Sequence, residues 1–181
     1  TVSVSTLLSV TTNANPSSIC LGGSSQLNAT GGTTYTWQPG NLTGSPTVSP
    51  SATTTYTVTG TNANGCSNTS ITTIVVNALP TVSASATPSS ICLGGSSQLS
   101  ATGGTSYTWQ PGNLTGSPIV SPTINTIYTV TATNANGCTA TASATIIEND
   151  SLQVTATGTT NVSCYGNSDG ALDITVTGGV G

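Results

Sequence analysis

The chain has 181 residues, no lysine, arginine or histidine, four acidic residues and a formal net charge of −4. Without lysine and arginine it lacks the groups that neutralise phosphates, which excludes nucleic acid binding and attraction to anionic lipid surfaces. Without histidine and lysine it lacks the usual base for a serine or cysteine nucleophile, so we expect no enzyme.

Two further properties of the composition narrow the fold class. Threonine is abundant beside valine and isoleucine, which favours strands over helices, so we expect an all-β protein. No apolar run reaches the roughly 18 residues of a membrane helix, so no direct membrane insertion is expected.

A repeat of 72 residues organises the chain. Residues 16–66 align without a gap with residues 88–138, and 43 of these 51 positions are identical. Similarity at a fixed period is typical of structural modules joined end to end. The predicted modules are the closing strand of a preceding module at 1–8, repeats at 9–79 and 80–150, and the incomplete start of another repeat at 151–181.

In the first copy, apolar and polar side chains alternate with period two in three segments, at residues 26–30, 34–38 and 56–61. This alternation predicts strands with one buried face. Residues 62–65, Asn-Ala-Asn-Gly, indicate a turn that leads into a further strand at 71–76. Prolines at 39, 46 and 50 break the middle into loops or short edge strands. Many short strands with frequent turns predict tandem β-sandwich modules, arranged as beads on a string.

Each full copy has one cysteine near its start and one directly after the Asn-Gly turn. The even number predicts one disulfide within each module, Cys20–Cys66 and Cys92–Cys138, and therefore export to an oxidising compartment. Closing such a loop would stabilise a small module by roughly 4 kcal/mol. Zinc is the competing interpretation, but histidine and Cys-x-x-Cys pairs are absent; free thiols are the other alternative. Cys164 occupies the position of Cys20 and Cys92 and is expected to be unpaired in this segment.

The sequence resembles a known group of surface proteins. Residues 16–22, 29–37, 53–59 and 62–66 resemble the immunoglobulin-like and PKD-like repeats of large Bacteroidota surface proteins, and the second copy matches as well. Residues 163–170, Ser-Cys-Tyr-Gly-Asn-Ser-Asp-Gly, resemble the start of an SprB repeat. The resemblance implies a cell-surface protein exported by a type IX secretion system and used in adhesion, gliding motility or filament formation.

The aromatic residues have a structural and a functional interpretation. Trp37 and Trp109 are predicted core aromatics, as the buried tryptophan is in immunoglobulin-like domains; the alternative is that they form sugar-stacking platforms. Tyr56 and Tyr128 are likewise assigned to the core, where they resemble tyrosines that anchor a corner through their hydroxyl group.

The joint after the second repeat holds the remaining candidate sites. Glu148 and Asp150 could bind Ca²⁺, but only Asp169 and Asp173 could add carboxylates, so a solvated polar linker is the favoured interpretation. Asp150-Ser151-Leu152 resembles the short O-glycosylation acceptor of Bacteroidota, which makes Ser151 a candidate for modification. No other cofactor is expected.

The sequence thus predicts an extracellular, structural repeat segment of a bacterial surface adhesin or filament. Its modules would supply reach and mechanical stability. Its partners would be surface glycans, other cells or like chains. The alternatives are an array of glycan-binding modules and a spacer within a secreted enzyme.

Overall fold

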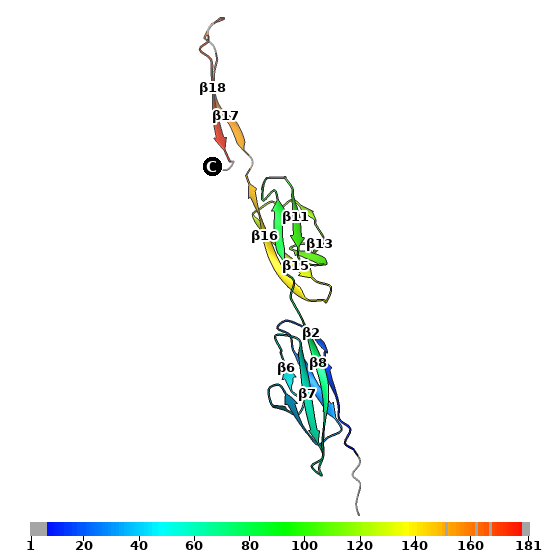
Figure 1. Cartoon of the computed structure of the whole chain (residues 1–181). Helices are drawn as coiled ribbons and strands as arrows, with labels where there is room; N and C mark the ends of the chain where they lie inside the picture. The colour runs from blue at the N-terminus through cyan, green and yellow to red at the C-terminus, as the bar shows by residue number, and fades with distance from the viewer. Residues whose placement is uncertain (1–6, 151, 162, 167, 179–181) are drawn as a thin grey trace, which may run out of the picture. The chain divides into compact units, whose positions relative to one another are not determined.

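The structure is a computed structural model that describes residues 7–150, 152–161, 163–166 and 168–178. These residues form 18 strands and no helix, which confirms the all-β prediction (Figure 1). A membrane-spanning helix is accordingly absent from the described residues. The chain divides into two compact units. One holds the chain up to Pro80 together with Asn134–Cys138, and the other holds Thr81–Thr133 and the chain from Thr139 onward.

The first unit is a sandwich of two sheets. The smaller sheet has the strand order β1-β3-β6, and the larger has the order β2-β8-β7-β4-β5. Their bounds are β1 Thr11–Asn15, β2 Ser18–Cys20, β3 Ser25–Thr30, β4 Thr34–Gln38, β5 Leu42–Thr43, β6 Thr47–Val48, β7 Thr54–Thr61 and β8 Ser67–Asn77.

The core of this unit lies between the two sheets. Leu27 and Val48 come from the smaller sheet, whereas Trp37, Val58 and Ile74 come from the larger one, and all five are buried. The alternation in β7 produces this arrangement, since every second side chain along a strand points to the same face. The burial pattern of β7 has that period, with Tyr56, Val58 and Gly60 buried.

The second unit repeats this sandwich. Its sheets have the orders β14-β11-β9 and β10-β16-β15-β12-β13. The bounds are β9 Ser83–Thr87, β10 Ser90–Cys92, β11 Ser97–Thr102, β12 Ser106–Gln110, β13 Leu114–Thr115, β14 Ile119–Val120, β15 Thr126–Thr133 and β16 Thr139–Asn149. Leu99, Trp109, Val130 and Ile146 fill its core.

A hairpin follows the second sandwich. Strands β17 (Gln153–Thr160) and β18 (Ala171–Thr177) pair antiparallel with a bulge between Ala156 and Gly158. The predicted closing strand at 1–8 falls mostly outside the described residues; Leu7 and Leu8, which are described, are not in a strand.

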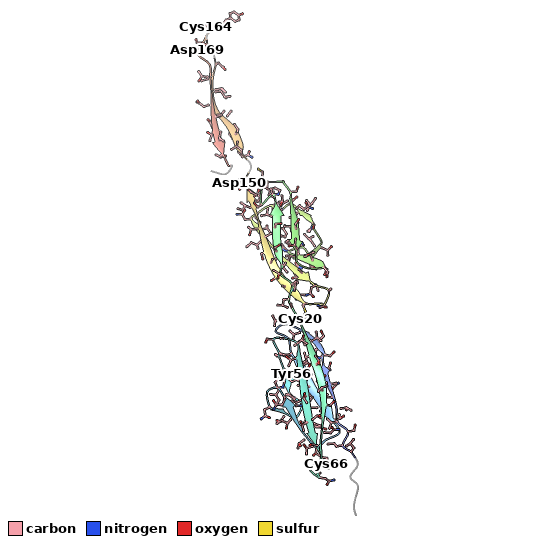
Figure 2. The ribbon with its side chains drawn as sticks, viewed as in Figure 1. Cys20, Tyr56, Cys66, Asp150, Cys164 and Asp169 are labelled. Atoms are coloured by element: carbon pink, nitrogen blue, oxygen red, sulfur yellow. A yellow bond between two sulfur atoms is a disulfide. The ribbon has the colours of Figure 1, made fainter. Side chains whose placement is uncertain are left out.

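The topology contradicts both predicted disulfides. Strand β2 runs parallel to β8 and places Cys20 beside Asn77, at the end of β8, whereas Cys66 precedes the start of that strand. Because β8 is 11 residues long, its ends are about 35 Å apart at ~3.3 Å a residue. The Cα atoms of a disulfide lie roughly 5.5–6 Å apart, so Cys20 cannot reach Cys66. Figure 2 shows these two cysteines at opposite ends of the first unit.

The same geometry separates the second predicted pair. Cys92 lies beside Asn149, at the end of β16, and Cys138 precedes the start of β16. Cys92–Cys138 is therefore also wrong. Neither cysteine of a copy can bond to the other, because each copy holds its two cysteines at opposite ends of one long strand.

Candidate functional site

The disulfide that does form joins Cys20 to Cys138. Their Cα atoms are 5.6 Å apart, although the two residues are separated by 118 positions in the sequence. Cys20 belongs to the first copy of the 72-residue repeat and Cys138 to the second. Cys138 is only 1% exposed, so the bond is shielded from solvent at that end.

On one side of the disulfide, Cys138 lies in a turn that the side-chain amide of Asn134 holds in place. The Asn134 Oδ1 atom accepts hydrogen bonds from the backbone N–H groups of Asn136 and Cys138, both at 3.0 Å. Gly137 adopts a φ of +78°, which glycine enters at little cost. The Asn134 Nδ2 group also donates to the carbonyl of Ala78 at 3.0 Å. The sequence of the turn thus presents Cys138 in one backbone conformation and anchors it beside the end of β8.

On the other side of the disulfide, Cys20 is the last residue of β2 and leads into a tight loop. The N–H of Leu21 donates to the carbonyl of Asn77 at 2.8 Å, and the N–H of Gly23 donates to the carbonyl of Cys20 at 2.8 Å. Gly22 between them has a φ of +88°. The Asn77 Nδ2 group donates to the Ser18 hydroxyl at 2.7 Å, which ties the ends of β2 and β8 together. Hydrogen bonds around the loop therefore hold Cys20 at the edge of the larger sheet.

The remaining cysteines differ in exposure. Cys66 is half-buried, whereas Cys92 and Cys164 are exposed and belong to no disulfide among the described residues.

The four predicted core aromatics lie in the cores. Trp37 and Trp109 are fully buried, and their Nε1 groups donate to the carbonyls of Gly44 and Gly116 at 2.8 and 2.9 Å. Tyr56 and Tyr128 are buried as well. Burial raises the pKa of the Tyr56 phenol, because the charged form loses solvation. A buried indole cannot serve as a sugar-stacking platform.

Other tyrosines make the hydroxyl-to-backbone bonds that were expected of Tyr56 and Tyr128. The Tyr35 hydroxyl donates to the carbonyl of Gly32 at 2.7 Å and accepts from the Gly32 N–H at 2.8 Å. Tyr107 makes the equivalent pair of bonds to Gly104. The Gly-Gly pair three residues before each tyrosine is the sequence signal that could have identified this corner.

The acidic residues do not assemble into a cation site. Asp150 is exposed, and no three histidine, cysteine, aspartate or glutamate side chains gather in the described part of the chain. Glu148 has one carboxylate oxygen, Oε1, that is buried without a hydrogen-bond partner among these residues. Asp169, in the hairpin loop, accepts the N–H of Ser163 at 3.0 Å, and hydrogen bonds from Ser163 hold the pKa of its carboxyl below the usual range. The candidate glycosylation residue, Ser151, lies outside the described residues.

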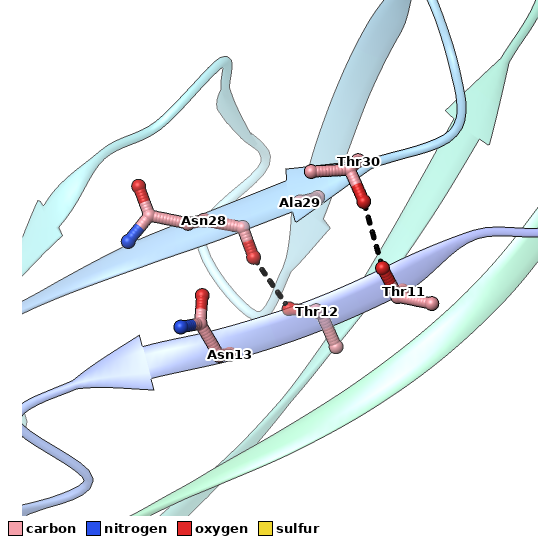
Figure 3. Close-up of a pocket in the computed structure, with 6 residues that line it drawn as sticks. All are labelled: Thr11, Thr12, Asn13, Asn28, Ala29 and Thr30. Carbon is pink, nitrogen blue, oxygen red and sulfur yellow. Dashed lines mark hydrogen bonds between the residues drawn. The ribbon is translucent and has the colours of Figure 1, made fainter.

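A hollow lies along strands β1 and β3 in the smaller sheet of the first unit (Figure 3). Its volume is about 240 Å³, and its lining consists of Thr11, Thr12, Asn13, Asn28, Ala29 and Thr30. The hydroxyls of Thr11 and Thr30 bond to each other at 2.7 Å, and the Thr12 hydroxyl donates to the carbonyl of Asn28 at 2.9 Å. These three hydroxyls therefore bond within the sheet, and the lining has no aromatic side chain.

Comparison with known families finds one match. Residues 156–181, a range that contains most of β17 and all of β18, match the SprB repeat. Comparison with curated proteins finds no match.

Several solved structures resemble the chain at low sequence identity. The fibronectin(III)-like modules of Clostridium thermocellum CbhA align at 12% identity over 77% of this chain and 95% of theirs, with a TM-score of 0.41. A Ca²⁺-stabilised adhesin with which an Antarctic bacterium binds ice aligns at 18% identity over 83% of this chain and 52% of its own, with a TM-score of 0.42. Murine CEACAM1b aligns at 14% identity over 79% of this chain and all of its own, with a TM-score of 0.39.

Proposed function

We propose that this chain is a structural repeat segment of an extracellular bacterial surface adhesin or filament and that it supplies reach and mechanical stability. The match of residues 156–181 to the SprB repeat supports a surface protein. The near-identical 72-residue copies support a structural role, because each added copy lengthens a shaft without adding a new activity. The modules of this shaft would be residues 9–79 and 80–150, followed by the SprB-type repeat at 151–181.

The Cys20–Cys138 disulfide is the observation that carries the proposal. It closes a covalent loop over 118 sequence positions. When the chain is pulled from its ends, tension passes from Cys20 through the bond to Cys138 and bypasses the residues between them. The bypassed stretch includes strands β3 to β15, which contain most of both cores. A shaft exposed to shear benefits from such a bypass, whereas an enzyme or an isolated binding module has no need of one.

The compartment and the export route are part of the same proposal. A structural disulfide persists in an oxidising environment, which supports an exported protein. We assign the protein to the outer surface of a Bacteroidota cell, with export by a type IX secretion system and a role in adhesion or gliding. Its partners would then be surface glycans, other cells or like chains.

The structural role can be tested by replacing the two repeats with unrelated domains of similar length. In cells that carry the gene, residues 9–150 are replaced by two unrelated immunoglobulin-like domains of similar length, or are deleted. A shaft function predicts that the replacement preserves attachment to a surface under flow and that the deletion weakens it. Loss of attachment with both variants, at equal surface display measured by antibody labelling, would instead assign the binding activity to these repeats.

A further inference from the structure

Each sandwich carries a broad face of hydroxyl side chains on the outside of its larger sheet. In the first unit, Thr36, Thr59 and Thr69 form one row across β4, β7 and β8, and Ile71 lies in the next row on β8. These side chains point away from the core, because the alternate side chains of the same strands fill it. All four are exposed. We call this side of β4, β7 and β8 the threonine face.

The second unit has the same threonine face on β12, β15 and β16. The corresponding row consists of Thr108, Thr131 and Thr141. Isoleucine stands at position 127, where the first copy has Thr55. Ile71 is 67% exposed and Ile127 is 62% exposed, so both faces present a large aliphatic side chain to solvent.

Hydroxyl groups of the threonine face bond to one another across the strands. The hydroxyls of Thr55 and Thr73 lie 2.9 Å apart on β7 and β8. The hydroxyls of Thr129 and Ser143 lie 3.0 Å apart on β15 and β16. A hydroxyl that already has a partner within the sheet loses less on leaving water than an unpaired one. Another surface can therefore cover the threonine face without leaving these hydroxyls unsatisfied.

The two repeats contain no charged side chain before Glu148. The four acidic residues that give the chain its net charge of −4 are Glu148, Asp150, Asp169 and Asp173. Net charge normally keeps soluble proteins apart by mutual repulsion. The threonine faces lack this protection, so two of them can approach each other without an electrostatic barrier.

We propose that the threonine faces pack against the threonine faces of a second copy of this chain. The absence of charge favours this partner, because an acidic or basic partner would bury charges that find no counter-charge on the face. A second copy brings an equally neutral surface, and β-sheets pack well face to face. The inference rests on the proposed function in taking like chains as partners, and it adds the surface through which they meet.

The size of the threonine face limits how strong this contact can be. Strand β7 has eight residues and is about 26 Å long at ~3.3 Å a residue, and three strands ~4.8 Å apart make a face about 14 Å wide. One face therefore offers roughly 400 Å², half of the ~800 Å² that each partner buries in a standard interface. The faces of two repeats together reach that area, and the contact strengthens with each repeat that takes part.

The experiment measures self-association of the full chain by sedimentation equilibrium up to a concentration of about 1 mM. All chains carry Cys92→Ser and Cys164→Ser, so that these exposed thiols cannot crosslink them. Because the face lacks the tryptophan, tyrosine and arginine anchors of tight interfaces, we expect a dissociation constant of roughly 0.1–1 mM. Ile71→Glu with Ile127→Glu places a carboxylate on each face and should raise this constant about tenfold or more, because like charges then meet in the contact.

The matched control is Thr47→Glu with Ile119→Glu, two positions that correspond to each other in the repeat. They lie on β6 and β14 in the smaller sheets, and the next residues, Val48 and Val120, are buried. The side chains at 47 and 119 therefore point outward from the other side of each sandwich. Ile119 is 71% exposed, close to Ile127, so the control adds the same charge away from the threonine face. It should change the dissociation constant by less than about twofold.

Weakening by the first pair of substitutions alone would support the contact, and salt at roughly 1 M should then restore part of the association by screening the added charges. A wild-type face that leaves the chain monomeric at about 1 mM, or equal weakening by both pairs, would show that the proposal is wrong. Circular dichroism checks that each variant is folded. Attachment under flow tests the structural role separately, so either proposal can fail alone.

Discussion

Each sandwich is organised around one tryptophan that is both packed and hydrogen-bonded. Trp37 has no exposed surface, and its Nε1 group satisfies the carbonyl of Gly44 in the loop between β5 and β6. Trp109 repeats this arrangement with Gly116. The indole thus fixes a loop as well as filling the core, which requires both its size and its N–H group.

Replacing Trp37 by phenylalanine should lower the free energy of unfolding of the first unit by about 1–3 kcal/mol, because the smaller ring leaves a cavity and the Gly44 carbonyl loses its donor. Urea unfolding followed by circular dichroism measures the change, and Trp109 remains as a fluorescent reporter of the other core. Trp109→Phe is the matched variant, with an expected loss of similar size in the second unit. A change of only a few tenths of a kcal/mol in either would show that the indole is not a principal core residue.

At the scale of elements, the strands with alternating side chains are the ones that the sequence predicts. The expected strand at 34–38 is β4, and those at 26–30 and 56–61 lie within β3 and β7. Strand β8 extends well beyond the expected 71–76, because its pairing with β7 continues to Ser67. Strand β1 has no apolar alternation to reveal it. Its sequence is Thr-Thr-Asn-Ala-Asn, and it becomes a strand by pairing with β3 over five residues.

The turn before β4 requires glycine at position 31, because a side chain would not fit there. Gly31 has a φ of +98°, and a Cβ atom there would overlap the carbonyl oxygen of Ser9. Gly31→Ala should therefore destabilise the first unit by more than the ~1 kcal/mol that positive φ alone costs a side chain. Gly44→Ala is the control, since its φ is +68° and nothing lies within 4 Å of the added atom. Thermal unfolding of both variants measures which substitution destabilises the unit more. Equal destabilisation by the two would mean that the Ser9 backbone moves aside to accept the added methyl group.

At the scale of the whole molecule, the Cys20–Cys138 disulfide determines how far the chain can be stretched. Cys20 and Cys138 enclose a loop of 118 positions. Those residues cannot contribute length under force while the bond is intact, whatever happens to their fold. The bypass is therefore a property of the covalent connectivity and survives unfolding of either sandwich.

Force spectroscopy with handles at the two ends should detect the bypass directly. Reduction, or Cys138→Ser, should add about 400 Å to the final contour length, at ~3.5 Å for each of the 118 positions. Cys92→Ser is the control and should leave the contour length of a single chain unchanged. An oxidised chain that extends as far as the reduced one would contradict the Cys20–Cys138 connectivity.

The sequence by itself determined the β class, the repeat, the principal strands and the aromatic residues that occupy each core. These features are local, because period-two alternation and turn residues act over a few neighbouring positions. The partners of the cysteines were decided only by the tertiary structure. Counting cysteines per copy suggested Cys20–Cys66, but bonding depends on distance, and β8 places these residues at opposite ends of one strand. The turn at Cys138 meets the loop at Cys20 because both lie beside the end of β8, an arrangement that exists only after the sheets have formed.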